Sequence, residues 1–341
     1  MKKLRGVCVG AGYFSQFHYD AWSRLDQVEI VALCDLDEVK TKEVSLKWGV
    51  PRIYSDFSEM LEKEQPDFVD IITPPAFHLD MCTLAAKAGT AIICQKPLAP
   101  SLEDAKKIAA LSGEYSVPMM VHENFRFQPW HREIKKILES GALGDQIFYM
   151  NFRMRMGDGW QQDAYMSRQP YFRTMPRLLI YETGIHFVDI FRYLAGEPTW
   201  LMARLKKLNK DIVGEDSGVV HFEFDSGVTA ILDGNRYNES NSADSRYTFG
   251  EFLIEGNEGS LRLYNDGNIT IQKLGESEKP HNYHPSKSSF AGDCVYATQK
   301  HFIDSLIAGN TFETSVEDYL KNVMIQEAIY ESSLNNTPCK L

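Results

Sequence analysis

Three polar side chains stand at helical spacing inside an apolar stretch. Glu182, His186 and Asp189 are separated by four and then three residues, so a helix places them on one face. Histidine exchanges protons near neutral pH, which makes His186 a candidate general base. Glu182 is suited to bind a substrate hydroxyl or to tune His186, and Asp189 is suited to orient the ring. One alternative is a His186–Asp189 pair that serves packing alone. We expect no metal, because the cluster has one histidine and no cysteine.

A glycine turn followed by a distant carboxylate has the spacing of a dinucleotide site. The apolar run 4–9 leads directly into Gly10-Ala11-Gly12, after which a helix begins. Gly10 allows a tight turn, and Gly12 lets the backbone approach a pyrophosphate at the helix N-terminus. Asp35 ends the next apolar run and can accept from ribose hydroxyls. No arginine or serine follows it to receive a 2′-phosphate, so we expect NAD rather than NADP. The alternative is an ordinary strand–helix turn, and Ser15 stands at the third glycine position.

Two further clusters follow apolar runs, where the ends of parallel strands bind ligands. Thr73-Pro74-Pro75 forms a rigid loop before His78, which we expect either to face the cofactor or to lie on a helix surface. Gln95-Lys96-Pro97 follows the apolar run 90–94. Because lysines are seldom buried unpaired, Lys96 is expected beside the nicotinamide, where partial burial and a cationic ring favour the neutral amine. It would then exchange a proton with a reacting hydroxyl; an ordinary strand-end lysine is the alternative.

The elements that position these residues change character near residue 122. Before it, strand-like runs alternate with helical stretches, which predicts a parallel sheet buried on both faces. Beyond it, strand-like runs between 199 and 273 lack intervening helices, which predicts an antiparallel sheet. The fold class is therefore α/β: a doubly wound Rossmann domain over 1–121, then an α/β domain with an open, mostly antiparallel sheet over 122–341. Helices are expected at 131–140, 176–194, 293–308 and 316–332.

Composition excludes several classes of protein. The chain has 341 residues and a formal net charge of -11, which is the opposite of a basic nucleic-acid-binding surface. No apolar run approaches the roughly 18 residues of a membrane span. The six cysteines form no CxxC pair and fall partly in apolar runs, which indicates buried thiols in the reducing cytoplasm. An open antiparallel sheet exposes an apolar face, so we expect self-association as a dimer or tetramer.

In these residues the chain resembles the Gfo/Idh/MocA family, the glucose–fructose oxidoreductase and inositol dehydrogenase group. The resemblance covers nearly the whole chain, and the family fold agrees with the two domains described above. The motifs that carry it are Gly10-Ala11-Gly12, Thr73-Pro74-Pro75 with His78, Lys96-Pro97, Asn124 with Arg126, and Gly184-Ile185-His186-Phe187-Val188-Asp189. One departure is Gln95, which stands where the family has glutamate. It leaves Lys96 less stabilised as a cation, which either suits proton transfer or weakens catalysis.

The resemblance also implies individual roles. Lys96 and His186 are expected to be catalytic, with Glu182 at the family's acid position. The expected cofactor contacts are Gly10, Gly12, Tyr13, Phe14, Asp35, Thr73, Pro74, His78, Gln95, Lys96 and Asn124. The expected substrate contacts are Lys96, Arg155, Trp160, Glu182 and His186. Trp160 is suited to stack on a sugar, with a packing anchor as the alternative. One of the arginines before Glu182 is suited to clamp a carboxylate, with a solvated surface as the alternative; they are Arg153, Arg155, Arg168, Arg173 and Arg177.

Together these features predict an NAD-dependent dehydrogenase. It is expected to oxidise a secondary hydroxyl of a sugar, an inositol or a sugar acid, with the hydride passing to the nicotinamide. Two alternatives remain open: an NAD-binding sensor or regulator without turnover, and an NAD-assisted glycoside-cleaving enzyme.

Overall fold

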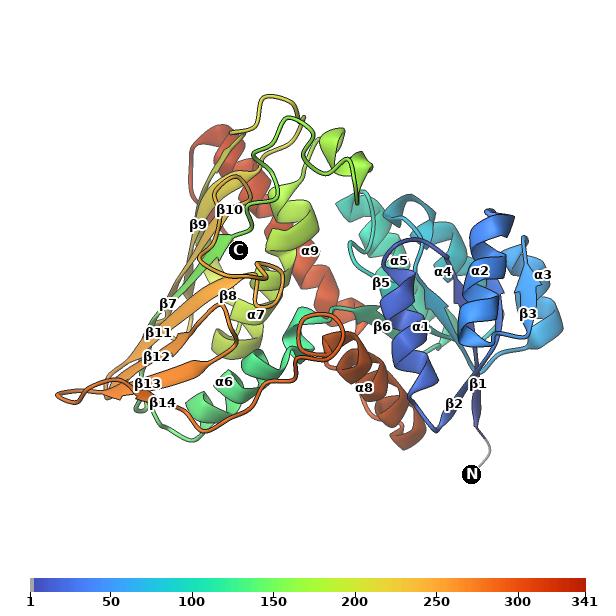
Figure 1. The fold of residues 1–341 in the computed structure, drawn as a ribbon, viewed down its shortest axis with the longest axis horizontal. Helices are drawn as coiled ribbons and strands as arrows, with labels where there is room; N and C mark the ends of the chain where they lie inside the picture. The colour runs from blue at the N-terminus through green and yellow to red at the C-terminus, as the bar shows by residue number, and fades with distance from the viewer. Residues whose placement is uncertain (1–2) are drawn as a thin grey trace. The chain divides into compact units, whose positions relative to one another are not determined.

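The computed structural model describes residues 3–341 and divides into two compact units (Figure 1). The first unit comprises Met1–Asn124 and Cys294–Val323, and the second comprises Phe125–Asp293 and Met324–Leu341.

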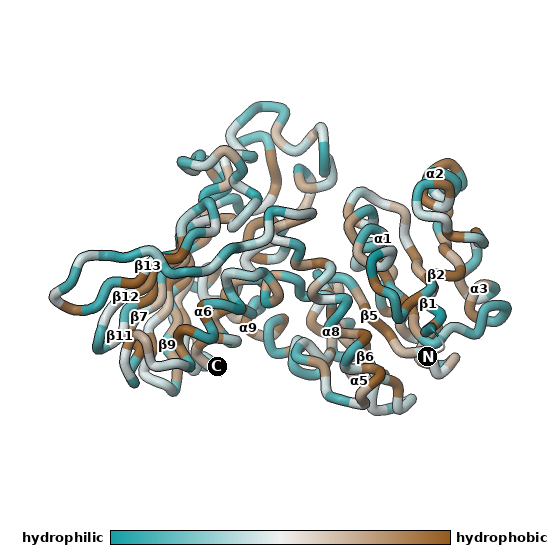
Figure 2. The backbone as a smooth tube through the Cα atoms, turned by 60° about the horizontal axis from the view of Figure 1, so that its bottom comes forward, coloured by the Kyte–Doolittle hydropathy of each residue, from teal (hydrophilic) through white to brown (hydrophobic). Residues whose placement is uncertain are grey.

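The first unit is built on a six-stranded parallel sheet in the order β3-β2-β1-β4-β5-β6. The strands are β1 Leu4–Val9, β2 Val28–Cys34, β3 Arg52–Tyr54, β4 Phe68–Ile71, β5 Ala91–Gln95 and β6 Met119–His122. Strands β1, β2 and β5 are largely hydrophobic, as expected of a sheet covered on both faces (Figure 2). The order reverses between β1 and β4, which creates the crevice where doubly wound folds bind nucleotides. The predicted Rossmann fold is confirmed.

Helices connect these strands, and their ends follow the local sequence. They are α1 Ser15–Ser23, α2 Glu38–Trp48, α3 Phe57–Glu64, α4 His78–Lys87 and α5 Leu102–Tyr115. Asp37 caps α2 by accepting from the backbone N–H groups of Val39 and Lys40, and Gly49 ends that helix in the left-handed region. Ser101 caps α5 in the same way.

The chain returns to the first unit near its C-terminus, whereas the sequence indicated a single change of domain near residue 122. Helix α8 (Cys294–Ala308) supplies Phe302, whose ring packs against Phe68 of β4 at 5.6 Å. The segment before helix α9 (Val316–Asn335) then extends the sheet, because Thr314 exchanges backbone and side-chain hydrogen bonds with Val121 of β6. Edge pairing and an aromatic contact thus draw a remote segment into the first core.

The second unit contains a nine-stranded sheet in the order β14-β13-β12-β11-β7-β10-β9-β8-β15. Neighbours are antiparallel except β7 and β10, which confirms the mostly antiparallel sheet. The strands are β7 Ile147–Arg155, β8 Pro198–Lys206, β9 Ser217–Phe224, β10 Thr229–Asn235, β11 Gly250–Gly256, β12 Gly259–Leu263, β13 Ile269–Lys273, β14 Lys279–Pro280 and β15 Cys339–Lys340.

One face of this sheet carries the core of the second unit. Helix α7 (Ile185–Ala195) packs Phe187 onto Phe152 of β7 at 4.0 Å between ring centroids, and helix α6 (Pro129–Glu139) places His131 against Phe252 of β11. Residues that alternate with this buried set, such as Asn151 of β7, are partly exposed on the other face.

The helix predicted over 176–194 is shorter and has two parts. A π-helical turn over Leu179–Gly184 precedes α7, and the residues before it are not helical. The carboxylate of Glu215 accepts from the backbone N–H groups of Leu178 and Ile180, which caps the turn where the expected helix would have continued.

Among residues 3–341, no helix combines the length and apolar character needed to span a bilayer.

Candidate active site

The nucleotide turn after β1 needs its two glycines for different reasons. Gly10 has φ +116°, and a Cβ there would lie 2.8 Å from the backbone oxygen of Ile72. Its N–H donates to the carbonyl of Cys34 at 2.9 Å, which ties the turn to β2. A Cβ on Gly12, in contrast, would meet nothing within 4 Å. Gly10 therefore serves the fold, while Gly12 leaves the open space that an approaching pyrophosphate requires.

Asp35 at the end of β2 braces the same turn. Its carboxylate accepts from the N–H of Ala11 at 2.7 Å and from the N–H of Asp37 at 2.9 Å. Each oxygen keeps a lone pair for a ribose hydroxyl. Asp35 also lines a hollow together with Glu38 and Tyr54. Two carboxylates beside one hollow repel the 2′-phosphate of NADP and can accept from ribose hydroxyls, so these acceptors fit NAD.

His78 occupies a different place from the one expected. Its ring is fully buried, and its nitrogens lie 2.7 Å from the carbonyl oxygen of Thr73 and 3.0 Å from that of Leu98. Burial lowers the pKa of the imidazole, against the opposing effect of the carbonyls. His78 is thus neither turned to a ligand nor on the helix surface. His78 links the loop after β4 to the loop after β5. Pro74, next to Thr73, is exposed.

Lys96 follows β5 directly and is partly exposed. Its backbone N–H donates to Oε1 of Gln95 at 2.7 Å, so Gln95 is turned toward the main chain of the lysine. Asn124 lies just after β6 and is buried; its Nδ2 has no hydrogen-bond partner among residues 3–341. A buried donor without a partner fits a site that a bound group completes.

Tyr13 and Phe14 open α1 beside the glycine turn. Tyr13 is exposed and Phe14 partly so, and both pack edge-on or tilted against Phe17 one turn later. The cofactor residues expected on the first unit, His78 excepted, therefore gather at the carboxyl ends of its strands.

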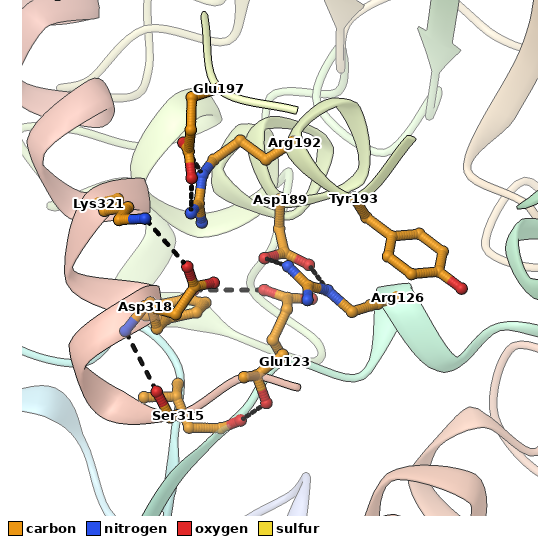
Figure 3. A network of polar contacts seen from close by, with 12 residues as sticks. Glu123, Arg126, Asp189, Arg192, Tyr193, Glu197, Ser315, Asp318 and Lys321 are labelled. Carbon is orange, nitrogen blue, oxygen red and sulfur yellow. Dashed lines mark hydrogen bonds and ion pairs between the residues drawn. The ribbon is translucent and has the colours of Figure 1, made fainter. Parts of the chain in front are cut away.

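His186 in the second unit is held by an aromatic stack. Its ring lies parallel to that of Phe125, with centroids 3.8 Å apart and an interplanar angle of 4°. Asp189, expected to orient this ring, instead receives two hydrogen bonds from Arg126, at 2.9 Å from Nε and 2.7 Å from Nη2 (Figure 3). This buried pair fixes α7 to the turn that contains Phe125. The ring of His186 is thus oriented by its stack on Phe125 and by the Arg126–Asp189 pair, which joins the turn to α7.

Glu182 lies in the π-helical turn that precedes α7, one turn before His186. It is partly exposed. Burial raises the pKa of the neighbouring Tyr171 hydroxyl to about 12, and the charge of Glu182 adds to that shift. π-helical turns occur frequently at functional sites, because they displace side chains from the regular helical positions.

Arg236, which directly follows β10, is not among the residues predicted from the sequence. Its buried guanidinium donates to both carboxylate oxygens of Asp158, at 3.2 Å and 2.5 Å, and to Oγ1 of Thr183 at 3.0 Å. It thereby joins the loop after β7 to the residue next to Glu182. The signal that singled out Lys96 is absent here, because β10 alternates between buried and partly exposed residues and ends in Asp233-Gly234-Asn235.

The two remaining substrate candidates lie in different surroundings. Trp160 is 47 % exposed on the loop after β7, and its Nε1 donates to Glu239 at 3.2 Å, so a face of the indole can stack on a ligand. Arg155 forms an ion pair with Asp233 at 2.6 Å. Strand alternation places Arg155 opposite the buried Met154, on the sheet face that α7 does not cover. The structure therefore does not bring Arg155 to the side of the sheet that packs against α7.

Chemically, the first unit offers a nucleotide cradle with a lysine at a strand end, and the second offers a buried histidine beside a partly exposed carboxylate. No group of three or more histidine, cysteine, aspartate or glutamate side chains among residues 3–341 is arranged to hold a metal.

The chain is similar in sequence and in fold to known proteins. D-apiose dehydrogenases of Paraburkholderia graminis and Rhizobium rhizogenes are 36% and 34% identical to the chain over 98% of its length, covering 88% and 96% of their own. A crystal structure of an oxidoreductase from Agrobacterium radiobacter in complex with NAD+, L-tartaric acid and magnesium superimposes with a TM-score of 0.92 at 32% identity, covering 99% of this chain and 98% of that one.

Family models match both parts of the sequence. Residues 4–123 match the oxidoreductase family with an NAD-binding Rossmann fold, and residues 131–262 match the GFO/IDH/MocA C-terminal domain. The chain therefore belongs to the Gfo/Idh/MocA family of oxidoreductases and uses NAD as its cofactor.

Proposed function

We propose that this protein oxidises a CH–OH group of a sugar with NAD, and that D-apiose is the first substrate to test. The observation that carries the proposal is the similarity to two D-apiose dehydrogenases over 98% of the chain. The expected alternatives, an inositol or a sugar acid, stay within the same chemistry. A bacterial scyllo-inositol 2-dehydrogenase is 25% identical over 99% of the chain.

Lys96 and His186 handle the proton in this proposal. Bound NAD supplies a nicotinamide ring that accepts a hydride. Gly12 leaves room for the pyrophosphate, Asp35 accepts from the adenosine ribose, and Asn124 offers its buried amide to the cofactor. Either Lys96 or His186 takes the proton of the substrate hydroxyl, while the hydride of the same CH–OH group goes to the nicotinamide. Glu182 binds a second hydroxyl of the substrate, and Trp160 stacks on its apolar face.

The test is a screen for NAD reduction with D-apiose, inositols, aldonates and tartrate, followed by two variants. Lys96→Met keeps the side-chain length without the amine, and His186→Gln keeps a polar group without the base. General acid–base groups contribute about 100- to 10,000-fold, so kcat should fall by that order while NAD affinity and Tm change little. Variants that melt earlier but retain turnover would show that both residues serve the fold alone. Binding of NAD without reduction by any compound would favour the sensor alternative.

Asp35 should set the preference for NAD. Asp35→Ala removes the charge that repels a 2′-phosphate, so the ratio of NADP to NAD affinity should rise, measured by calorimetry. Because the carboxylate also accepts from Ala11 and Asp37, the variant should weaken binding of both cofactors. Equal affinities for NAD and NADP in the unmodified protein would contradict the assignment.

We also propose self-association through the uncovered face of the second sheet, as a dimer or tetramer. A cross-strand row on that face runs through Leu253, Asn151, Ile231, His221 and Met202, all of them partly exposed. Apolar side chains in such a row gain stability by meeting a second copy.

A cytoplasmic location is part of the proposal. All six cysteines are free thiols and five of them are buried, which suits a reducing compartment. Fractionation of cells that express the tagged protein tests this location.

A further inference from the structure

A chain of buried polar groups lies beneath the loop that carries Lys96. The N–H of Lys96 donates to Oε1 of Gln95, as described above. Nε2 of Gln95 lies 3.0 Å from Nε2 of His18 on α1, and Nδ1 of His18 lies 2.8 Å from Oδ2 of Asp70 on β4. His18 and Asp70 are fully buried, and Gln95 is 8 % exposed. The polar chain therefore connects the interior of the first unit with the backbone of Lys96.

Donors and acceptors at its ends fix the direction of every hydrogen bond. A backbone N–H only donates, so the oxygen of the Gln95 amide must face Lys96, and the NH2 group must face His18. That NH2 group only donates, so Nε2 of His18 must accept and carries no proton. The ring proton therefore resides on Nδ1, where it is donated to Asp70. This connectivity requires a neutral imidazole.

Aromatic rings and protonated thiols surround His18 and the carboxylate of Asp70. The ring of His122 on β6 packs against His18 at 4.2 Å between centroids, and Phe14 packs edge-on from α1. Burial raises the pKa of Cys8 on β1, Tyr19 on α1 and Cys94 on β5, all close to Asp70, so these groups stay protonated.

Two neutral donors join His18 at Oδ2 of Asp70, while the buried Oδ1 has no hydrogen-bond partner among residues 3–341. Nε1 of Trp22 on α1 donates to Oδ2 at 2.7 Å, and the amide of Gln299 on α8 reaches the same oxygen at 3.5 Å. Neither of these two donors brings a cation to Asp70.

We infer that His18 and Asp70 are positioning residues that act through Gln95 to hold the backbone of Lys96, and that the neutral side chain of Gln95 makes this hold independent of pH. The inference rests on the proposed role of Lys96. The amide of Gln95 accepts from the N–H of Lys96 and donates to His18 without any change of protonation. A carboxylate at the same position would turn an oxygen toward the lone pair of His18 and would need a proton on one of the two groups.

The decisive variant is Gln95→Glu, which keeps the shape of the side chain. Its kcat for NAD reduction with D-apiose, divided by that of the unmodified enzyme, should fall as the pH rises from 6 to 9, because the required proton is lost. Since a misplacement near 1 Å costs on the order of 100-fold in rate, the ratio should drop by about 10- to 100-fold. Gln27→Glu places the same charge on the exposed surface of the first unit and should give a flat ratio.

Adding Asp70→Asn to Gln95→Glu tests whether the effect passes through His18 and Asp70. Asparagine still accepts from His18, but the substitution removes one of the two carboxylates that favour the extra proton shared by His18 and the new glutamate. The fall in the kcat ratio should therefore occur at lower pH. A role in packing alone would not move it. Melting curves at each pH establish that both variants remain folded.

Nitrogen-15 spectra of histidine side chains test the tautomer without a substrate, with His18→Gln used for assignment. Nε2 of His18 should be unprotonated in the unmodified protein and protonated in Gln95→Glu at low pH. A protonated Nε2 in the unmodified protein, or a ratio of kcat values that is constant with pH, would overturn the inference. Full turnover of Lys96→Met would instead refute the role of Lys96 and leave the tautomer result unaffected.

Discussion

Arg236 and Arg168 share one carboxylate but should contribute unequally to stability. Asp158 accepts two hydrogen bonds from the buried Arg236 and a single one, at 3.3 Å from Nη2, from Arg168, whose side chain is 23 % exposed. Arg236 also contacts the faces of Tyr165 and Phe172, each about 5.1 Å from the guanidinium carbon. Replacing each arginine by methionine keeps its length and removes its charge, which makes the two variants a matched pair.

The magnitudes follow from burial. Removing one partner of a buried ion pair costs about 3 to 5 kcal/mol, and the lower end applies here because Asp158 is partly exposed and retains Arg168. Arg168→Met should cost no more than about 1 kcal/mol, as for surface pairs. In a domain of this size about 1 kcal/mol corresponds to roughly 2–4 °C in Tm, so Arg236→Met should lower Tm by about 6–12 °C.

The assay is thermal unfolding followed by far-ultraviolet circular dichroism, with NAD reduction measured below Tm. Arg236→Met should also lower kcat, because Thr183 beside Glu182 loses its donor. The double variant should lose more free energy of unfolding than the two single variants together, since either arginine alone neutralises part of Asp158. Equal Tm shifts for the two single variants, or strict additivity, would refute this account.

Three further predictions test other features. Gly10→Ala should lower Tm, because its Cβ would lie 2.8 Å from the oxygen of Ile72, whereas Gly12→Val should leave Tm unchanged and abolish NAD binding by calorimetry; the reverse pattern would contradict the assigned roles. Burial lowers the pKa of His131 to about 4, so below pH 6.5 the unfolded chain binds a proton that the folded chain refuses. The free energy of unfolding in urea should therefore fall by about 3 kcal/mol between pH 6.5 and 4, and His131→Asn should remove that part of the slope. Ile231→Glu should dissociate the oligomer in light scattering while the exposed control Leu46→Glu does not, and an unmodified protein that is monomeric at micromolar concentration would refute the proposed interface.

Local signals were sufficient for the nucleotide unit. Gly10, Gly12 and Asp35 lie within one strand–helix–strand passage, so their spacing already specified the turn that the structure contains. Lys96 was recognisable because a cation after a buried strand has few structural explanations.

Long-range contacts explain what the sequence could not predict. The contact between Arg236 and Asp158 joins residues far apart in the chain, and so does the pairing of Asp189 with Arg126. His78 was misplaced because burial depends on the loop at Leu98, which no local pattern reveals. The cap on Ile180 likewise comes from Glu215, which follows helix α7 and strand β8 in the chain.

The late return of the chain to the first unit has a consequence for synthesis on the ribosome. Phe302 and Phe312 belong to the same hydrophobic cluster as Phe68 and Leu33, yet they are translated after nearly all of the second unit. A nascent chain that has reached Asn124 holds all six strands of the parallel sheet but leaves its β6 edge uncovered. Such an intermediate exposes aromatic surface and a free strand edge, both of which recruit chaperones or promote aggregation. The second unit is therefore expected to pair strands β7 to β14 before the first is complete, and a fragment that ends at Asn124 should require α8 in trans to become soluble.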